Sequence, residues 1–153
     1  MTKIIMNGCN GKMGQVISRL VAEDNEAEIV CGVDINTTVA NPYPVVASIE
    51  EFRGEADVVI DFSHPSCLPS ILSYCKRTKT PVVLATTGFS AEEKAAFTEA
   101  SKEIPVFFSA NMSLGINLLI SLAKQAAKLL EGNFDIEIIE RHHNKKIDAP
   151  SGT

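Results

Sequence analysis

The C-terminal stretch Glu140–Thr153 carries the densest set of reactive side chains in the chain. A histidine can donate a proton near neutral pH, a lysine supplies fixed positive charge, and consecutive backbone N–H groups in a turn can hold an anion. These groups suit a site that binds a small dicarboxylate and transfers a proton to it. A solvated basic loop is the alternative interpretation. The candidate residues are His142, His143, Lys146, Ser151, Gly152 and Thr153.

The paired histidines do not indicate a metal site. Adjacent residues of an extended strand point to opposite faces, so His142 and His143 are poorly placed to bind one ion. No third ligand follows at a recognisable spacing. We therefore predict that this stretch binds no metal.

A glycine-rich turn near the N-terminus is suited to hold a phosphate. Gly8, Gly11 and Gly14 follow a short apolar run and open a helical pattern. The pyrophosphate of a dinucleotide approaches backbone N–H groups at a helix N-terminus closely, and a Cβ atom there would block it. The spacing G-x-x-G-x-x-G is one residue longer in its first interval than the usual G-x-G-x-x-G. The other candidate cofactor-binding residues of this turn are Asn10, Lys12 and Met13.

An acidic residue stands where a dinucleotide-binding fold needs one. Asp34 ends the second predicted strand, 20 residues after Gly14, and a carboxylate there can accept hydrogen bonds from the adenosine ribose. The same charge repels the 2′-phosphate of NADP(H), and Ile35 and Asn36 beside it do not offset that charge. We predict NAD(H), with NADP(H) possible through Lys12. A structural glycine turn beside a solvated aspartate is the alternative.

Three later loops follow predicted strands, at the edge where open α/β sheets bind ligands. Their backbone groups are suited to the carboxamide of a nicotinamide, and Phe62 to cover a ring face. Ordinary turn and capping chemistry, with Ser113 as a helix N-cap, is the alternative. We interpret His64, which precedes a proline in a turn, as structural. The loops are Asp61–Pro65, Thr86–Phe89 and Ser109–Ser113.

Short apolar runs that alternate with helical patterns predict an α/β fold, a doubly wound parallel sheet. Ser90 and Glu93 have the spacing of a capping box at the start of the third helix. The segment Asn36–Ala47 is predicted to be a loop. Strands are predicted at Lys3–Met6, Glu28–Val33, Val58–Asp61, Val82–Ala85 and Val106–Phe108, and helices at Met13–Glu23, Ser66–Arg77 and Ala91–Lys102.

The pattern changes after Asn111. Leu114–Leu130 predicts a buried helix that is apolar on most of its circumference, and Gly132 can end it. Phe134–Ile139 alternates apolar and acidic residues, as a half-exposed strand does. We therefore predict two domains, residues 1–112 and the beginning of a second one at 113–153.

The composition is that of a soluble globular protein. Among 153 residues, 45% are hydrophobic and 22% charged, which excludes disordered, collagenous and disulfide-dense classes. The net charge of −5 disfavours nucleic acid and anionic membranes as partners. Four cysteines show no C-x-x-C spacing, and neither a membrane span nor a signal peptide is apparent. We expect a cytoplasmic protein with reduced thiols.

These motifs resemble the 4-hydroxy-tetrahydrodipicolinate reductase (dihydrodipicolinate reductase) family of bacterial lysine and diaminopimelate biosynthesis. The resemblance covers the whole chain, and the C-terminal motif is its most specific part. The matching segments are Gly8–Gly14, Asp61–Ser63, Thr86–Phe89, Ala110–Asn117 and Glu140–Thr153.

The resemblance implies a Rossmann domain that binds NAD(P)H, followed by an α+β, mixed-sheet domain that binds a cyclic dicarboxylate. It implies hydride transfer to ring carbon C4 of the substrate, with His142 as general acid and Lys146 stabilising the developing charge. His143 and the turn Ser151–Thr153 would hold the carboxylates, and Asp34 the ribose. The residues assigned to the surroundings of the cofactor are Phe62, Thr86, Thr87, Gly88, Ala110, Asn111 and Met112.

The family also implies a homotetramer, and its members continue beyond the motif that ends here at Thr153. We therefore expect either a fragment of a longer protein or a truncated form. Two other functions stay open: a nucleotide-binding module without turnover, and a different NAD(P)-dependent dehydrogenase.

Overall fold

The computed structural model describes residues 1–139 and 141. The chain divides into two compact units, Met1–Phe108 and Ser109–Thr153. Each unit is described by itself.

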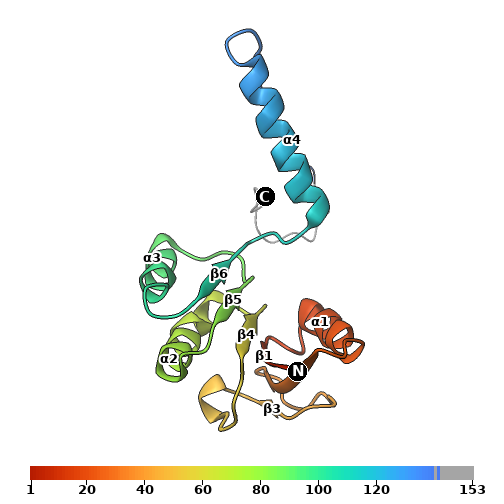
Figure 1. Ribbon diagram of the computed structural model, residues 1–153, viewed down its shortest axis with the longest axis vertical. Coiled ribbons are helices and arrows are strands. Elements are labelled where there is room, and N and C mark those ends of the chain that lie inside the picture. Colours follow the sequence, from red (N-terminus) through yellow and green to blue (C-terminus); the bar gives the residue numbers. More distant parts are fainter. Residues whose placement is uncertain (140, 142–153) are drawn as a thin grey trace. The chain divides into compact units, whose positions relative to one another are not determined.

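The first unit is built on one six-stranded sheet in which all neighbouring strands are parallel. The strand order is β3-β2-β1-β4-β5-β6, so the direction of winding reverses between β1 and β4. Figure 1 shows α1 on one face of the sheet and α2 and α3 on the other. The strands are β1 (Thr2–Asn7), β2 (Ala27–Val33), β3 (Val45–Val46), β4 (Val58–Asp61), β5 (Val82–Leu84) and β6 (Val106–Phe108), and the helices are α1 (Lys12–Ala22), α2 (Leu68–Thr78) and α3 (Ala91–Ala100).

The doubly wound α/β fold predicted from the sequence is confirmed, with one strand more than predicted. All five predicted strands are present. The sixth, β3, lies in the segment expected to be a loop, and pairs with Gly32 and Val33 at the edge of the sheet. A strand of two residues is too short to show a hydrophobic period, and Pro44 directly before it reads as a turn signal. The prediction of a loop over Asn36–Ala47 was therefore wrong at its end.

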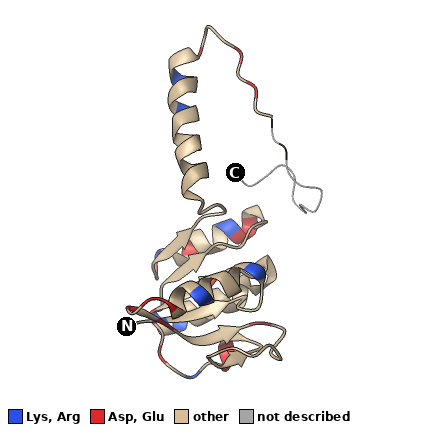
Figure 2. Cartoon of the chain, turned by 90° about the vertical axis from the view of Figure 1, so that its right-hand side faces the viewer, with Lys and Arg blue, Asp and Glu red and all other residues tan. Residues whose placement is uncertain are grey.

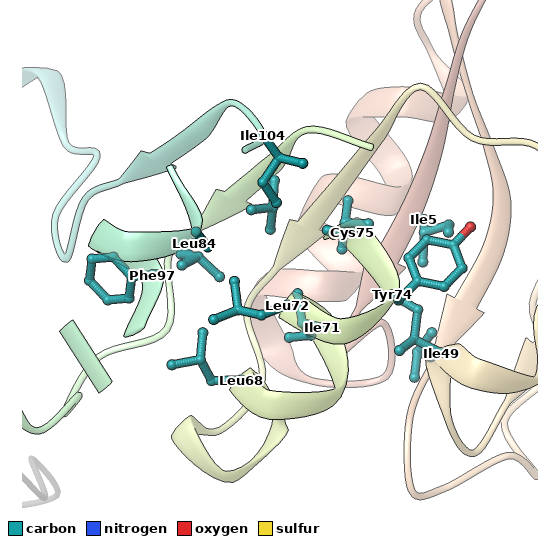
Figure 3. Close-up of a cluster of buried hydrophobic side chains, with 14 of the residues drawn as sticks. Ile5, Ile49, Leu68, Ile71, Leu72, Tyr74, Cys75, Leu84, Phe97 and Ile104 are labelled. Carbon is teal, nitrogen blue, oxygen red and sulfur yellow. The ribbon is translucent and has the colours of Figure 1, made fainter. Parts of the chain in front are cut away.

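Side chains from β1, β2, β4, β5, α2 and α3 form most of the main core (Figure 3). The strands are short and apolar because both of their faces are covered. Cys75 lies in this core, where burial raises the pKa of its thiol to about 12. All four cysteines are free thiols. The labelled core residues are Ile5, Ile49, Leu68, Ile71, Leu72, Tyr74, Cys75, Leu84, Phe97 and Ile104.

The predicted capping box at the start of α3 is confirmed. The Ser90 hydroxyl accepts a hydrogen bond from the Glu93 backbone N–H at 3.2 Å, and the Glu93 carboxylate accepts one from the Ser90 N–H at 2.8 Å. Phe97, one turn further along, is buried against Phe89 and Phe108. The cap therefore fixes the start of a helix that covers the β5–β6 end of the sheet.

Replacing Ser90 by alanine is expected to lower the free energy of unfolding by about 1 kcal/mol, because the Glu93 backbone N–H at the start of α3 loses its hydrogen-bond acceptor. Urea unfolding measures the change. Ser101→Ala is the matched control, since its hydroxyl donates only to the Thr98 carbonyl in an exposed turn. Equal destabilisation by both substitutions would contradict a specific role of the cap.

The second unit begins with α4 (Leu114–Leu130), which has the bounds predicted from the sequence. Ser113 caps it by accepting a hydrogen bond from the Ile116 N–H at 3.3 Å, and Gly132 follows its end with φ +84°. Lys124 and Lys128 are its only charged residues (Figure 2). No helix in the described part of the chain is long and apolar enough to cross a membrane.

Two predictions for the second unit were wrong. None of the α4 residues is buried, and Leu114 and Leu129 are more than four-fifths exposed. Phe134–Ile139 is exposed and forms no strand. The physical reason is common to both: burial of a helix face needs a second layer and a strand needs a hydrogen-bonded neighbour, and no described residue of this unit supplies either.

Candidate functional site

A cavity of about 270 Å³ lies at the carboxyl ends of β1, β2 and β4. The register of the sheet brings the last residues of these strands level, since Asn7 pairs with Val33 on one side and with Asp61 on the other. This is the point at which the winding reverses, where open α/β sheets bind ligands. The lining residues are Asn7, Gly8, Gly11, Val33, Asp34, Ile35, Ala47, Phe62, Ser63, His64 and Cys67.

Two of the three glycines in the turn between β1 and α1 are required by the packing of the protein itself. Gly8 has φ +78°, and a Cβ atom there would lie 2.6 Å from the Phe62 carbonyl oxygen. A Cβ atom on Gly14 would collide with the Gly8 carbonyl oxygen and lie 2.7 Å from Cys9 Cα. Packing of the protein against itself therefore accounts for the glycine at both positions.

Gly11 differs from the other two glycines. A Cβ atom there would meet only the Gly8 carbonyl oxygen, at 3.3 Å, and its φ of −72° suits any residue. It is exposed, lines the cavity and occupies the N-cap of α1 without a side-chain cap. The first turn of α1 carries no acidic residue, so the positive end of the helix dipole is not neutralised there. The space beside Gly11 is thus open to an anion.

Asp34 directly follows β2 and faces the turn. Its Oδ2 accepts a hydrogen bond from the Asn10 N–H at 3.0 Å, and its Oδ1 accepts one from the Asn36 N–H at 2.9 Å. The Asn10 side chain continues this link, because it donates to the Asn36 carbonyl at 2.6 Å and accepts from Asn41 at 2.9 Å. The carboxylate is therefore held in one orientation at the wall of the cavity. In the part of the chain that the structure describes, no lysine or arginine lines the cavity.

The Asp34 charge also acts on the thiol beneath the turn. Burial, followed by the nearby Asp34 carboxylate, raises the pKa of Cys9 to about 11. Cys9 is fully buried and packs beside Gly32, where a Cβ atom would lie 2.6 Å from its sulfur. Cys9 is therefore a neutral packing group and not a nucleophile.

The loop after β4 supplies Phe62, Ser63 and His64 to the cavity. His64 caps the short 3-10 helix Pro65–Cys67: its Nδ1 accepts a hydrogen bond from the Ser66 N–H at 3.2 Å. The structural interpretation of His64 agrees with this contact, and the residue lies at the cavity within the loop Asp61–Pro65 that was expected to line a pocket.

The loop after β5 is not among the described residues that line this cavity. Thr86 is buried at the end of β5, whereas Thr87 and Gly88 are exposed. The predicted residues Ala110, Asn111 and Met112 belong to the second unit. There Asn111 Oδ1 accepts a hydrogen bond from the Ser113 N–H at 2.8 Å, next to the start of α4.

Of the predicted cofactor residues, Gly8, Gly11, Asp34 and Phe62 come together at the cavity. Asn10 contacts Asp34, and Lys12 and Met13 are exposed on the first turn of α1. The predicted C-terminal residues lie outside the described part of the chain. They are His142, His143, Lys146, Ser151, Gly152 and Thr153.

Several cavity residues were not predicted. Asn7 had a usable signal, because it is a small polar residue at the end of an apolar strand, whereas Ser63 belongs to the loop Asp61–Pro65 that was expected to line a pocket. Ala47 follows β3, and no signal pointed to it because the strand itself was missed. Within the described residues, no group of three or more His, Cys, Asp or Glu side chains is placed to hold a metal ion.

Comparison with known proteins decides the family. Residues 2–112 match the family model described as dihydrodipicolinate reductase, N-terminus, and residues 115–153 match the model for its C-terminus. The chain belongs to the dihydrodipicolinate reductase family. It is 58% identical over its whole length to the 4-hydroxy-tetrahydrodipicolinate reductase of Caldanaerobacter subterraneus subsp. tengcongensis, and 51% identical to that of Clostridium perfringens. It spans 60% and 61% of the lengths of these family members.

Comparison with solved structures supports the fold of this family. The dipicolinate-bound dihydrodipicolinate reductase of Paenisporosarcina sp. TG-14 superposes with a TM-score of 0.78 at 28% identity, over 99% of this chain and 62% of that one. The WlbA dehydrogenase of Bordetella pertussis, solved with NADH and UDP-GlcNAcA, gives a TM-score of 0.63 at 18% identity. That comparison covers 84% of this chain and 40% of the dehydrogenase, and it supports the Rossmann-like fold alone.

Proposed function

We propose that this chain is the nucleotide-binding part, with the beginning of the substrate-binding part, of a reductase that converts 4-hydroxy-tetrahydrodipicolinate to tetrahydrodipicolinate in lysine and diaminopimelate biosynthesis. Residues 1–112 would bind the dinucleotide, and residues 113–153 would begin the substrate domain. The reaction takes place in the cytoplasm, on a small cyclic dicarboxylate. The complete protein assembles as the homotetramer implied by its family.

The proposal rests on one observation: Gly11 and Asp34 line the same cavity. An anion beside Gly11 can accept hydrogen bonds from backbone N–H groups of the first turn of α1. The hydroxyls of a ribose nearby can donate hydrogen bonds to the Asp34 carboxylate. The N–H groups would bind the diphosphate of an adenosine diphosphate, and the Asp34 carboxylate would bind its ribose. Their distinct positions at the point where the winding reverses fit a dinucleotide that continues towards β4 and β5.

The cofactor in this proposal is NADH in preference to NADPH. The described residues that line the cavity include Asp34 and no lysine or arginine, so the Asp34 carboxylate would repel a 2′-phosphate there. Lys12 is the exposed cation of the adjacent turn, and it is the residue that would permit some binding of NADPH.

The chemistry in this proposal belongs to the C-terminal motif. The C4 hydroxyl of the 4-hydroxy compound would leave as water, and a bound nicotinamide would supply a hydride to ring carbon C4 of the resulting dihydrodipicolinate. His142 donates the proton and Lys146 stabilises the negative charge that develops. His143 and the turn Ser151–Thr153 hold the substrate's carboxylates through cationic and backbone donors.

The test is turnover by a chimera in which this chain is joined to the part of the Caldanaerobacter relative that lies beyond the matched region. We expect oxidation of NADH that depends on the freshly made product of dihydrodipicolinate synthase. His142→Ala is expected to lower turnover by about 100-fold or more, since general acid catalysis contributes about 10²–10⁴, with the Kd for NADH unchanged.

Ser101→Ala in the same chimera is the control, because Ser101 lies in an exposed turn after α3 and is not among the residues that line the cavity. NADH binding without oxidation in the unsubstituted chimera would overturn the reductase function and favour a nucleotide-binding module. Undiminished turnover of the His142 variant would remove that residue from its proposed role.

A further inference from the structure

A buried carboxylate that has no cationic partner among the described residues lies beneath the cavity. Asp61, the last residue of β4, is 1% exposed. Its Oδ1 accepts hydrogen bonds from Asn7 Nδ2 at 2.7 Å, and from the backbone N–H and hydroxyl of Ser63 at 3.2 and 2.5 Å. Its Oδ2 accepts one from the Thr86 hydroxyl at 2.7 Å. All four donors are neutral groups.

The cost of burying this charge points to a specific role. A carboxylate removed from water is stabilised only when hydrogen bonds replace its hydration. Here the four donors come from the ends of three neighbouring strands: Asn7 from β1, Ser63 after β4, and Thr86 after β5. Asn7 Nδ2 also donates to the Ser63 hydroxyl at 2.8 Å. One side chain thus joins three segments at the carboxyl edge of the sheet.

The bond to Thr86 fixes a loop that is otherwise exposed. Thr87 and Gly88 lie on the surface between two buried residues, Thr86 and Phe89. Phe89 is anchored by edge-to-face contacts with Phe97 and Phe108, at centroid distances of 5.6 and 5.8 Å. The Asp61 carboxylate holds the other end. The two exposed residues are therefore held at both ends, and Gly88 has φ +83° with no atom near the position of a Cβ.

We propose that Asp61 is a positioning residue that holds the Thr87-Gly88 loop in place for the nicotinamide half of the dinucleotide. This inference rests on the proposed function. The adenosine half lies at Asp34 on the β2 side of the reversal in winding, so the other half extends towards β4 and β5. Asp61 touches neither half. It acts through Thr86, and through Asn7 and Ser63 it ties the loop to the wall of the cavity.

The test compares NADH with ADP-ribose, which lacks the nicotinamide ring, as ligands of the 153-residue chain in calorimetric titrations. Thr86→Val removes the hydroxyl at nearly constant volume. We expect the Kd for NADH to rise by about fivefold, equivalent to about 1 kcal/mol, while the Kd for ADP-ribose stays within about twofold. Thr86→Ser keeps the hydroxyl and is expected to restore the Kd for NADH.

Thr80→Val is the matched control. Thr80 is as buried as Thr86, at 4% exposure, and its hydroxyl bonds only to Thr78 at 2.8 Å, before β5 rather than after it. A general loss of packing or stability would affect both valine variants, whereas positioning of the loop would affect only Thr86→Val. The readout is therefore the ratio of the Kd for NADH to the Kd for ADP-ribose, which a merely structural role would not change.

Asp61→Asn is a second, milder variant that keeps the side-chain shape. Its amide oxygen can accept the three donors that now reach Oδ1, and its NH2 group would face the Thr86 hydroxyl, which loses its charged acceptor. Asp61→Asn is expected to raise the ratio of the Kd for NADH to the Kd for ADP-ribose. An unchanged ratio in both Thr86→Val and Asp61→Asn, with the unsubstituted chain binding NADH, would overturn the role of Asp61. An unsubstituted chain that binds neither ligand would overturn the proposed function as well.

Discussion

Gly11→Ala is expected to abolish nucleotide binding while the chain stays folded, and Gly14→Ala is expected to disrupt folding itself. A Cβ atom on Gly11 meets one atom at 3.3 Å and points into open space at the cavity, so the protein tolerates it but a pyrophosphate would not. On Gly14 the same atom collides with the backbone of Gly8 and Cys9. We expect Gly11→Ala to raise the Kd for NADH by about 100-fold or more, about 2.7 kcal/mol.

The two glycines act as controls for each other. Gly14→Ala should lower the free energy of unfolding by about 3 kcal/mol or more, the upper range for overpacking. Gly11→Ala should change it by less than about 1 kcal/mol. Urea unfolding and calorimetric titration separate the two effects. If Gly11→Ala bound NADH as tightly as the unsubstituted chain, the pyrophosphate would not lie beside Gly11.

Asp34→Ala is expected to weaken NADH binding by about 10- to 100-fold, because hydrogen bonds to a charged group contribute about 1.5–3 kcal/mol. The binding of NADPH should weaken much less, since the variant also loses the charge that repels a 2′-phosphate. The ratio of the Kd for NADPH to the Kd for NADH therefore falls. Fluorescence titration with both reduced dinucleotides measures the ratio.

Asp57→Ala is the matched control for Asp34. Its carboxylate also accepts a backbone hydrogen bond, from the Lys3 N–H at 2.8 Å, but at the first residues of β1 and away from the cavity. It should leave both dissociation constants unchanged. Equal loss of NADH and NADPH binding in Asp34→Ala would show that the carboxylate only holds the Asn10 turn and does not contact the ribose.

The regular part of the fold could be predicted because its causes are local. Val58–Asp61 and Val106–Phe108 have the predicted bounds, since a strand covered on both faces reads as a short apolar run. The start of α3 could be placed because the Ser90 and Glu93 side chains act on neighbouring backbone atoms. β3 could not be found, because two residues at a sheet edge leave no periodic pattern.

The candidate site could be predicted only where its residues follow a spacing along the chain. The glycine turn and Asp34 follow from spacing along the chain, whereas the Asp61 cluster joins residues that lie 25 to 56 positions apart. No local pattern marks such a cluster. The burial of α4 failed as a prediction for a related reason: an apolar face shows that a helix can be covered, but the covering element is specified elsewhere.

The wall of the cavity is assembled from one short part of the sequence. Every described residue that lines it lies between positions 7 and 67. A ribosome that adds about 5–20 residues per second has therefore joined all of them before the first residue of β5 is added. Shortening the gene from its 3′ end down to codon 68 removes Thr86 and the loop that it holds, but none of the wall. A deletion of the first eleven codons, by contrast, removes Asn7, Gly8 and Gly11 together.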